Sequence, residues 1–338
     1  TLEGSLTREE IETTVSDQWI GGSAWISLLS SCEIGELSTD AKVALAAALL
    51  NDGKADDAKV LLLELKDTDC SSSRNARHLM GLIAASEGDE DTACALLRNA
   101  SRGGGITLIT AADRALAALG RHKERRELWR EASEADRDSD DGRLALASLA
   151  LLEGNTAETR RLLAAELLSV SEAASAGWLI YKESFFADFA RNWHEKNAFS
   201  ALEALASGAA PARQFGVGRE EDRQNVDFLY YRYVLCQRMG WRIQASGYAE
   251  LILRQPIYLG NAEALYVLRL AQDTKDPSAQ DLRKRILAWN QTGRENGNLY
   301  LPLRNALCLQ VLEGSMEGWR KLSGDLLYGH RARFELSV

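Results

Sequence analysis

Apolar residues recur with helical spacing in the first half of the chain. One stripe consists of Ala58, Leu61, Leu62 and Leu65, and the same spacing returns at positions 93, 96, 97 and 100. A spacing of i, i+3, i+4, i+7 lines the apolar side chains along one side of an α-helix. Each stripe follows a polar turn with one glycine and an earlier apolar segment, 41–50 or 78–85. The pattern therefore predicts pairs of antiparallel helices.

The glycines of these turns are themselves periodic. Gly53, Gly88, Gly120 and Gly154 are separated by 35, 32 and 34 residues. Glycine is favoured where a helix ends in a left-handed residue, because it has no Cβ to clash. We therefore expect each glycine to end one helix of a hairpin, and we expect an all-α fold built from about 34-residue repeats.

The residues around each glycine resemble the tetratricopeptide repeat (TPR). In the first unit, Leu45 and Ala46 lie eight and seven residues before Gly53, and the small Ala58 lies five residues after it. In that family the small residues let the two helices approach closely. The second unit has Met80, Gly81, Gly88 and Ala93 at the same positions.

Two further units fit this pattern less completely. The third keeps Gly120 and Trp129 but has Arg125 in the second small position, and the fourth has Thr159 there. Residues 39–170 thus resemble four TPR hairpins. The resemblance implies a right-handed α–α superhelix, a solenoid in which each hairpin stacks on the next.

The flanking regions are expected to differ from these four hairpins. We interpret residues 1–38 as N-terminal capping helices, at about 7–18 and 23–31. Residues 171–338 contain 21 of the 24 aromatic residues, yet helical patterns continue there, at 229–239, 262–271, 279–289, 303–312 and 319–326. We expect degenerate, aromatic-rich helical hairpins in this half, with a loop or boundary near 207–223.

Charge is also uneven along the chain. The net charge is -9, and the first 170 residues contain 30 acidic and 19 basic side chains, whereas the remainder has 19 and 21. Nucleic-acid binding requires clustered basic residues, so we do not expect it. The acidic half is interpreted either as a solubilising surface or as a surface for a basic partner.

Cysteine usage and hydropathy bear on the cellular compartment. The five cysteines are scattered and form no CxxC motif, which is typical of buried thiols in a reducing compartment. The longest apolar run, 43–50, is far too short to cross a membrane. We expect a cytoplasmic protein, or a periplasmic or secreted one if a signal peptide has been removed.

No motif predicts catalysis, a metal site or a cofactor. The segment from Asp136 to Gly142 resembles the start of a calcium loop, but its glycine is one residue late and Ala147 stands where glutamate is needed. We interpret it as an acidic loop before a helix. The triplet at 103–105 lacks the lysine of a phosphate loop, and the cluster Trp193-His194-Glu195 is interpreted as the tip of a core helix.

The TPR resemblance implies a scaffold for a protein or peptide partner, held on the concave face formed by the first helix of each hairpin. Inner positions such as Val43, Ala47 and Leu82 are apolar, so the carboxylate-clamping subset of the family is not expected. The groove residues carried over from the family are Asn51, Asn75, His78, Arg114, Tyr230, Gln237 and Arg238.

Two alternatives remain open at this point. The aromatic-rich half could be an accessory or catalytic domain of an enzyme that acts on a carbohydrate or small molecule, in which case aromatic and acidic side chains should converge in a cleft. It could instead form the interface of a homodimer, since aromatic residues are enriched in interface cores. A scaffold predicts that the aromatic side chains lie mostly between helices.

Overall fold

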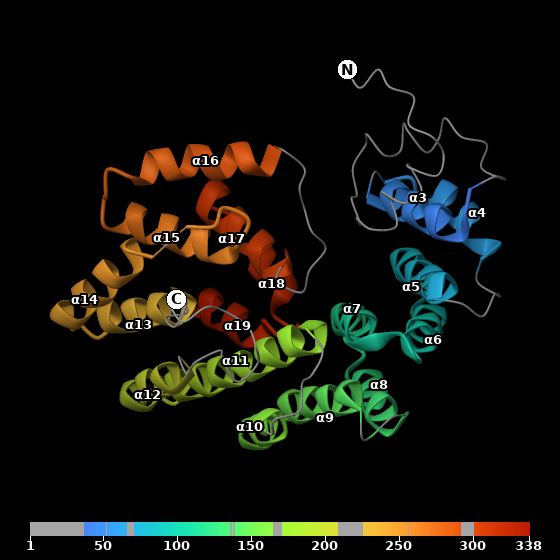
Figure 1. Ribbon diagram of the computed structural model, residues 1–338, viewed down its shortest axis with the longest axis horizontal. Coiled ribbons are helices and arrows are strands. Elements are labelled where there is room, and N and C mark those ends of the chain that lie inside the picture. The colour runs from blue at the N-terminus through green and yellow to red at the C-terminus, as the bar shows by residue number, and fades with distance from the viewer. Residues whose placement is uncertain are drawn as a thin grey trace. The chain divides into compact units, whose positions relative to one another are not determined.

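A computed structural model describes residues 37–51, 53–65, 71–135, 137, 139–164, 171–208, 226–255, 257–291 and 301–338 (Figure 1). These residues form helices and turns, with no strand among them, so the described part of the chain is all-helical, as expected. The capping helices expected at 1–38 lie outside the described residues, apart from Leu37 and Ser38, and so do residues 209–223 of the expected loop.

The chain divides into two compact units, and the boundary along the sequence falls within one helix, between Leu128 and Trp129. The described part of unit 1 contains five complete helices, and helix α8 (His122–Ala135) runs from unit 1 into unit 2. The division lies before residue 170, where the aromatic content of the sequence changes. The described helices that lie wholly in unit 1 are α3 (Thr39–Asn51), α4 (Ala55–Leu63), α5 (Ser71–Ser86), α6 (Glu90–Ser101) and α7 (Gly105–Ala118).

Unit 2 holds the remaining described helices. Its first hairpins contain a helix of 24 residues, α11, and its last helix is followed directly by Val338. The helices are α9 (Asp140–Leu152), α10 (Thr156–Ala164), α11 (Ser171–His194), α12 (Ala198–Gly208), α13 (Val226–Arg238), α14 (Arg242–Leu253), α15 (Ala262–Asp273), α16 (Ala279–Gln291), α17 (Leu301–Glu313), α18 (Glu317–Leu322) and α19 (Gly329–Ser337).

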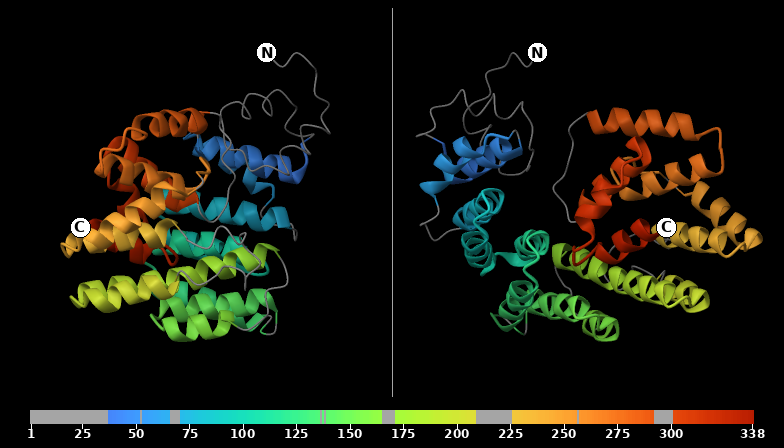
Figure 2. Two further views of the ribbon diagram at one scale, coloured as in Figure 1. Left: turned by 60° about the vertical axis from the view of Figure 1, so that its left-hand side comes forward. Right: turned by 180° about the vertical axis from the view of Figure 1, so that it is seen from behind.

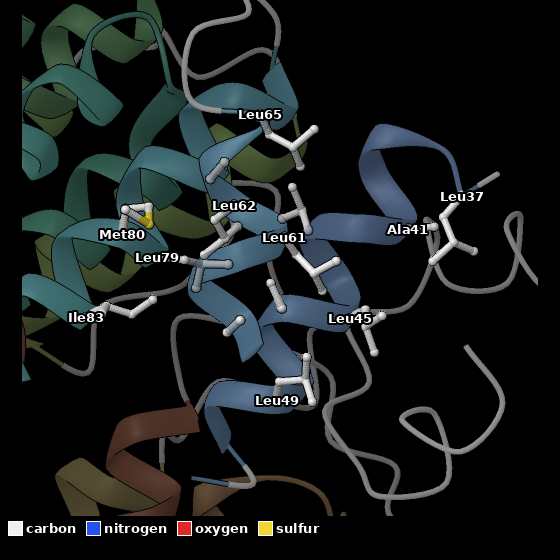
Figure 3. Packing of buried hydrophobic residues seen from close by; sticks show 14 residues of the cluster. Leu37, Ala41, Leu45, Leu49, Leu61, Leu62, Leu65, Leu79, Met80 and Ile83 are labelled. Carbon is white, nitrogen blue, oxygen red and sulfur yellow. The ribbon is translucent and has the colours of Figure 1, made fainter. Parts of the chain in front are cut away.

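Consecutive helices pack as hairpins, as α3 does with α4, α5 with α6, α9 with α10, and α13 with α14. Small residues make the hairpins of unit 1 tight. Ala46 and Ala58 are both fully buried, and a Cβ built on Gly81 would lie 2.9 Å from Cγ of Leu97. Their apolar cluster extends from Leu37 to Ile83 (Figure 3). The apolar stripes in the sequence therefore become the core of unit 1.

The helix-ending turns share one backbone geometry. Each of these turns contains a glycine with a positive φ, between 70° and 83°. The glycines are Gly53, Gly88, Gly120, Gly154 and Gly240. At Gly88 the amide donates to the carbonyl of Ala85, and the next amide, of Asp89, donates to the carbonyl of Ala84. These bonds satisfy carbonyl groups that the helix end leaves free. The periodic glycines are thus required by their backbone conformation.

Two lysines adopt the same turn without being glycine. Lys196, between α11 and α12, has φ 59°, and Lys275, between α15 and α16, has φ 57°. Their hydrogen bonds follow the pattern of Gly88, with the Lys196 amide bonded to the carbonyl of Trp193 and the Asn197 amide to that of Asn192. A search for glycine in the sequence does not find these two turns. We call all seven of these residues the turn residues of their hairpins.

Candidate partner-binding site

The turn residues give every hairpin a common register. Residues thirteen, ten and six positions before the turn residue are spaced i, i+3, i+7 on the first helix and therefore lie on one side of it. We call this side the first-helix face. The first helices are neighbours within each unit, α3 with α5 and α5 with α7 in unit 1, and α13 with α15 in unit 2. The groove residues expected from the sequence belong to this face or to the end of its helices.

In unit 2 the first-helix face holds a helix of the same chain. Helix α19 packs against α11, and Figures 1 and 2 show the two helices side by side in views from opposite directions. The Arg331 side chain of α19 is 1% exposed, so it is fully enclosed by the helices around it. Helix α19 therefore covers part of the first-helix face of unit 2.

Arg331 connects α19 to two first helices. Its Nε lies 3.1 Å from Oε2 of Glu183, its Nη2 contacts the other oxygen of that carboxylate, and its Nη1 lies 2.8 Å from Oδ2 of Asp227. Glu183 and Asp227 each lie thirteen residues before their turn residue, Lys196 and Gly240. Because the two acids occupy the same position in adjacent hairpins, one arginine can bind both.

The cluster around Arg331 is balanced in charge. Nζ of Lys182 lies 2.6 Å from Oδ2 of Asp227, so two cations face two carboxylates. Burial raises the pKa of Glu183 to about 7, although the charge of Arg331 opposes this shift. Burial acts in the same direction on Asp227, but Lys182 and Arg331 outweigh it and lower the pKa of that carboxyl. Charge neutrality lets the four groups be buried together.

Aromatic rings surround these charged groups. The Arg331 guanidinium lies 3.5 Å from the centre of the Phe186 ring, ten residues before Lys196. Phe334, one helical turn after Arg331, contacts Phe189 and Trp193 of α11 with ring centroids 4.7 and 5.7 Å apart. Trp193 is thus half-buried against Phe334, while His194 and Glu195 are exposed at the end of α11. These contacts hold α19 by burial as well as by charge.

A second set of contacts binds the end of α19. Nη1 of Arg269, six residues before Lys275, lies 2.9 Å from Oε2 of Glu335, and the same nitrogen donates to Gln310. Nη2 of Arg238 donates to the carbonyl oxygen of Val338 at 2.8 Å. The predicted groove residue Arg238 therefore binds a segment of its own chain.

The other groove residues expected in α13 differ in their access to solvent. Tyr230 is fully buried and its ring packs on Tyr266, with centroids 5.0 Å apart, so it cannot contact a partner. This corrects its expected place in the groove: the position faces a neighbouring aromatic layer that the sequence pattern did not reveal. Gln237 is exposed in the last turn of α13.

In unit 1 the corresponding residues lie on α5 and α7. Asn75 and His78 are thirteen and ten residues before Gly88, and Arg114 is six residues before Gly120. All three are half-buried, and Leu82, six residues before Gly88, is 38% exposed. Asn51 is the last residue of α3, and its side chain lies outside the described residues. The face of α5 thus offers an amide, an imidazole and an apolar side chain.

His78 is neutral at physiological pH. Burial lowers the pKa of His78 to about 4, and its Nδ1 has no hydrogen-bond partner among the described residues. A neutral imidazole can accept one hydrogen bond and donate another. Buried polar atoms usually have partners, but this atom is itself enclosed, so a molecule bound to the surface does not reach it.

No metal-binding arrangement is found in the described ranges. Among them, no group of three or more His, Cys, Asp or Glu side chains could hold a metal ion. The hydroxyl of Ser139, in the calcium-like segment, accepts from the amide of Gly142 and caps α9, while Asp136 and Asp138 lie outside the described residues. None of the described helices combines the length and apolar character needed to cross a membrane.

Comparison with known proteins provides no family assignment. No family model matches the chain, and no curated protein matches it either. The proposals below therefore depend on the residues and contacts of this chain.

Proposed function

We propose that this chain is a protein-interaction scaffold, built as a right-handed superhelix of TPR-like hairpins, that binds a partner helix or peptide on the first-helix face of unit 1. The observation that carries the proposal is the binding of α19 in unit 2. There, a helix is held by side chains at the thirteenth and sixth positions before the turn residues, Asp227 and Arg269 among them. The same positions in unit 1 carry Asn75, Leu82 and Arg114.

The register supports a specific role for Arg114. It is equivalent to Arg269, since each lies six residues before its turn residue, and Arg269 binds the carboxylate of Glu335. A partner that runs along α5 and α7 would bring a carboxylate to Arg114 and an apolar side chain to Leu82. Charge-assisted hydrogen bonds to arginine are strong and directional.

The charge of α5 favours an acidic partner. Its sequence contains Arg74 and Arg77 and no acidic residue, although the first 170 residues as a whole are strongly acidic. Electrostatic complementarity mainly sets specificity and association rate. We therefore assign the acidic surface of this half to its other helices, such as α4 with Asp56 and Asp57, and not to the binding face.

The buried state of the aromatic residues favours the scaffold over an enzyme. Phe186, Tyr231 and Tyr266 are fully buried between helices, and the converging acids Glu183 and Asp227 are also buried and paired with cations. Catalytic acids need access to a substrate. These two acids instead bind Arg331 of helix α19.

A site-specific photocrosslinking experiment tests this function. A photoreactive amino acid at Leu82, on the proposed face, should capture a partner from extract of the source organism. The same group at Val60 of α4, which is 66% exposed, serves as the control. Capture at Leu82 should fall at least tenfold when Asn75, His78 and Arg114 are replaced by alanine in a variant that keeps its helical circular dichroism. Equal capture at both positions, or capture unaffected by the triple variant, would rule out this face.

A further inference from the structure

Helix α19 contacts three consecutive hairpins of unit 2 in a definite charge order. Arg331 binds Glu183 of α11 and Asp227 of α13, and each of these acids lies thirteen residues before its turn residue. Glu335, about one helical turn later in α19, binds Arg269 of α15, which lies six residues before its turn residue. The helix bound in unit 2 therefore presents a basic residue to the first two hairpins and an acidic residue to the third.

Unit 1 has closely similar residues at the equivalent positions of its three hairpins. In the hairpins that begin with α3, α5 and α7, these residues are Asp40, Asn75 and Arg114. The acid of the first hairpin and the arginine of the third are retained, while an amide of similar shape replaces the aspartate of the second. The amide oxygen can still accept a hydrogen bond from a basic side chain. The positions that bind α19 in unit 2 thus have the same order of charge in unit 1.

Asp40 is accessible to a partner and lies beside α5. Its side chain is exposed, and its carboxylate accepts a hydrogen bond from the hydroxyl of Ser72, a residue of α5. Asn75 follows Ser72 by three residues, so the two residues lie on the same side of α5. A carboxylate and a neighbouring amide oxygen can together bind one guanidinium group, which has five N–H donors.

We propose that the partner of unit 1 is a helix with a basic residue and, four positions later, an acidic residue. The basic residue binds Asp40 and Asn75, and the acidic residue binds Arg114. This inference rests on the scaffold function proposed above and adds the polarity of the partner, whose N-terminal part lies on α3 and whose C-terminal part lies on α7. The acidic character favoured by the charge of α5 then belongs to the part of the partner that follows the basic residue.

Peptide binding to the full chain tests this charge order. The first probe is a helical peptide with arginine, phenylalanine and glutamate in the spacing of Arg331, Phe334 and Glu335, and the second has glutamate in place of the arginine. Fluorescence anisotropy should show that the parent chain binds the first peptide about tenfold more tightly or better, because the second brings a like charge to Asp40. Asp40→Lys should reverse this preference, and partial unfolding cannot produce such a reversal.

A third peptide tests the direction of the bound helix. It has the arginine and the glutamate of the first peptide exchanged, and it should bind the parent chain more weakly, since each of its charges meets a like charge in the proposed direction. Equal binding of the first and third peptides would reject the direction.

Matched variants separate this inference from the scaffold function. Asp56→Lys makes the same change at an exposed residue of α4, the second helix of its hairpin, and should leave the preference of the parent chain unchanged. The same preference in the parent and Asp40→Lys chains, or no binding of either of the first two peptides, would overturn the charge order. Photocrosslinking at Leu82 decides the scaffold function separately. A partner captured there equally well by the Asp40→Lys chain would keep the scaffold and reject only the proposed polarity.

Discussion

Arg125 and Asp113 form a buried, bidentate ion pair in the third hairpin. Nε and Nη2 of Arg125 each lie 3.0 Å from a carboxylate oxygen of Asp113, and the two residues are 3% and 1% exposed. Asp113 lies seven residues before Gly120, and Arg125 lies five residues after it. These are the positions at which the first hairpin has Ala46 and Ala58. Arg125 therefore departs from the repeat pattern together with Asp113. An ion pair across the hairpin replaces the two small residues of the first unit.

The ion pair predicts a strong dependence of each residue on the other. Asp113→Ala leaves the Arg125 guanidinium buried without its partner and should lower the free energy of unfolding by about 3 to 5 kcal/mol. The double variant Asp113→Ala/Arg125→Ala removes both charges and restores the residue types of the first hairpin. It should be more stable than Asp113→Ala alone. Urea unfolding of the two single variants and the double variant measures the coupling, and additive losses would contradict it.

The turn conformation of Lys275 predicts a stabilising substitution. A residue with a Cβ pays a steric cost in the left-handed region, roughly 1 kcal/mol. Lys275→Gly should therefore raise the unfolding free energy by about 0.5 to 1 kcal/mol after the greater entropy of unfolded glycine is subtracted. Gly240→Ala, at the equivalent turn with φ 72°, is the matched reverse change and should be destabilising. Thermal unfolding measures both, and effects of the same sign would disprove the argument.

The contacts of Arg331 predict that this side chain holds α19 against α11 and α13. Arg331→Met keeps much of the apolar volume near Phe186 but leaves Glu183 and Asp227 with Lys182 as their remaining cation among the described residues. We expect a loss of about 3 kcal/mol or more, and hydrogen exchange in α19 should accelerate more than in α15.

A matched control separates charge from general surface effects. Arg320→Met removes an arginine of α18 that pairs only with the exposed Glu317 among the described residues, at 3.6 Å. A surface pair of this kind contributes little, so exchange in α19 should not change. Similar exchange in both variants would show that Arg331 does not fasten the helix.

The lowered pKa of His330 predicts that the stability of the protein depends on pH. Burial, aided by Arg333, lowers its pKa to about 4 from 6.5, and its Nδ1 lies 3.0 Å from Nη2 of that arginine. The unfolded chain therefore binds the proton more readily, and stability is lost as pH falls through 6.5 toward 4. At pH 5 the loss attributable to this residue should be about 2 kcal/mol relative to pH 7.5.

The variant His330→Gln isolates this contribution, since glutamine can accept the same hydrogen bond but does not titrate. Urea unfolding at pH 7.5 and pH 5 should show a smaller loss for the variant than for the parent chain. His78, with a similarly lowered pKa, titrates in both proteins and cancels in the comparison. Identical losses would place the acid sensitivity elsewhere.

The sequence alone determined the helices and many of their ends. Local periodicity places Leu61 and Leu62 on one side of α4, and a glycine such as Gly88 is required by its own backbone angle. Both properties depend on neighbouring residues in the chain, so a reader of the sequence can derive them. The expected positions of Asn75 and His78 follow from the same local register.

Only the tertiary structure decided which first-helix face is occupied. The bond from Arg331 to Glu183 joins residues 148 positions apart, and no periodic pattern relates them. Lys196 and Lys275 adopt left-handed turns because their hairpins fix the backbone, not because their side chains favour it. Likewise, Tyr230 is buried by Tyr266 from the next first helix. Local preferences define helices, whereas long-range packing decides which of their side chains remain available to a partner.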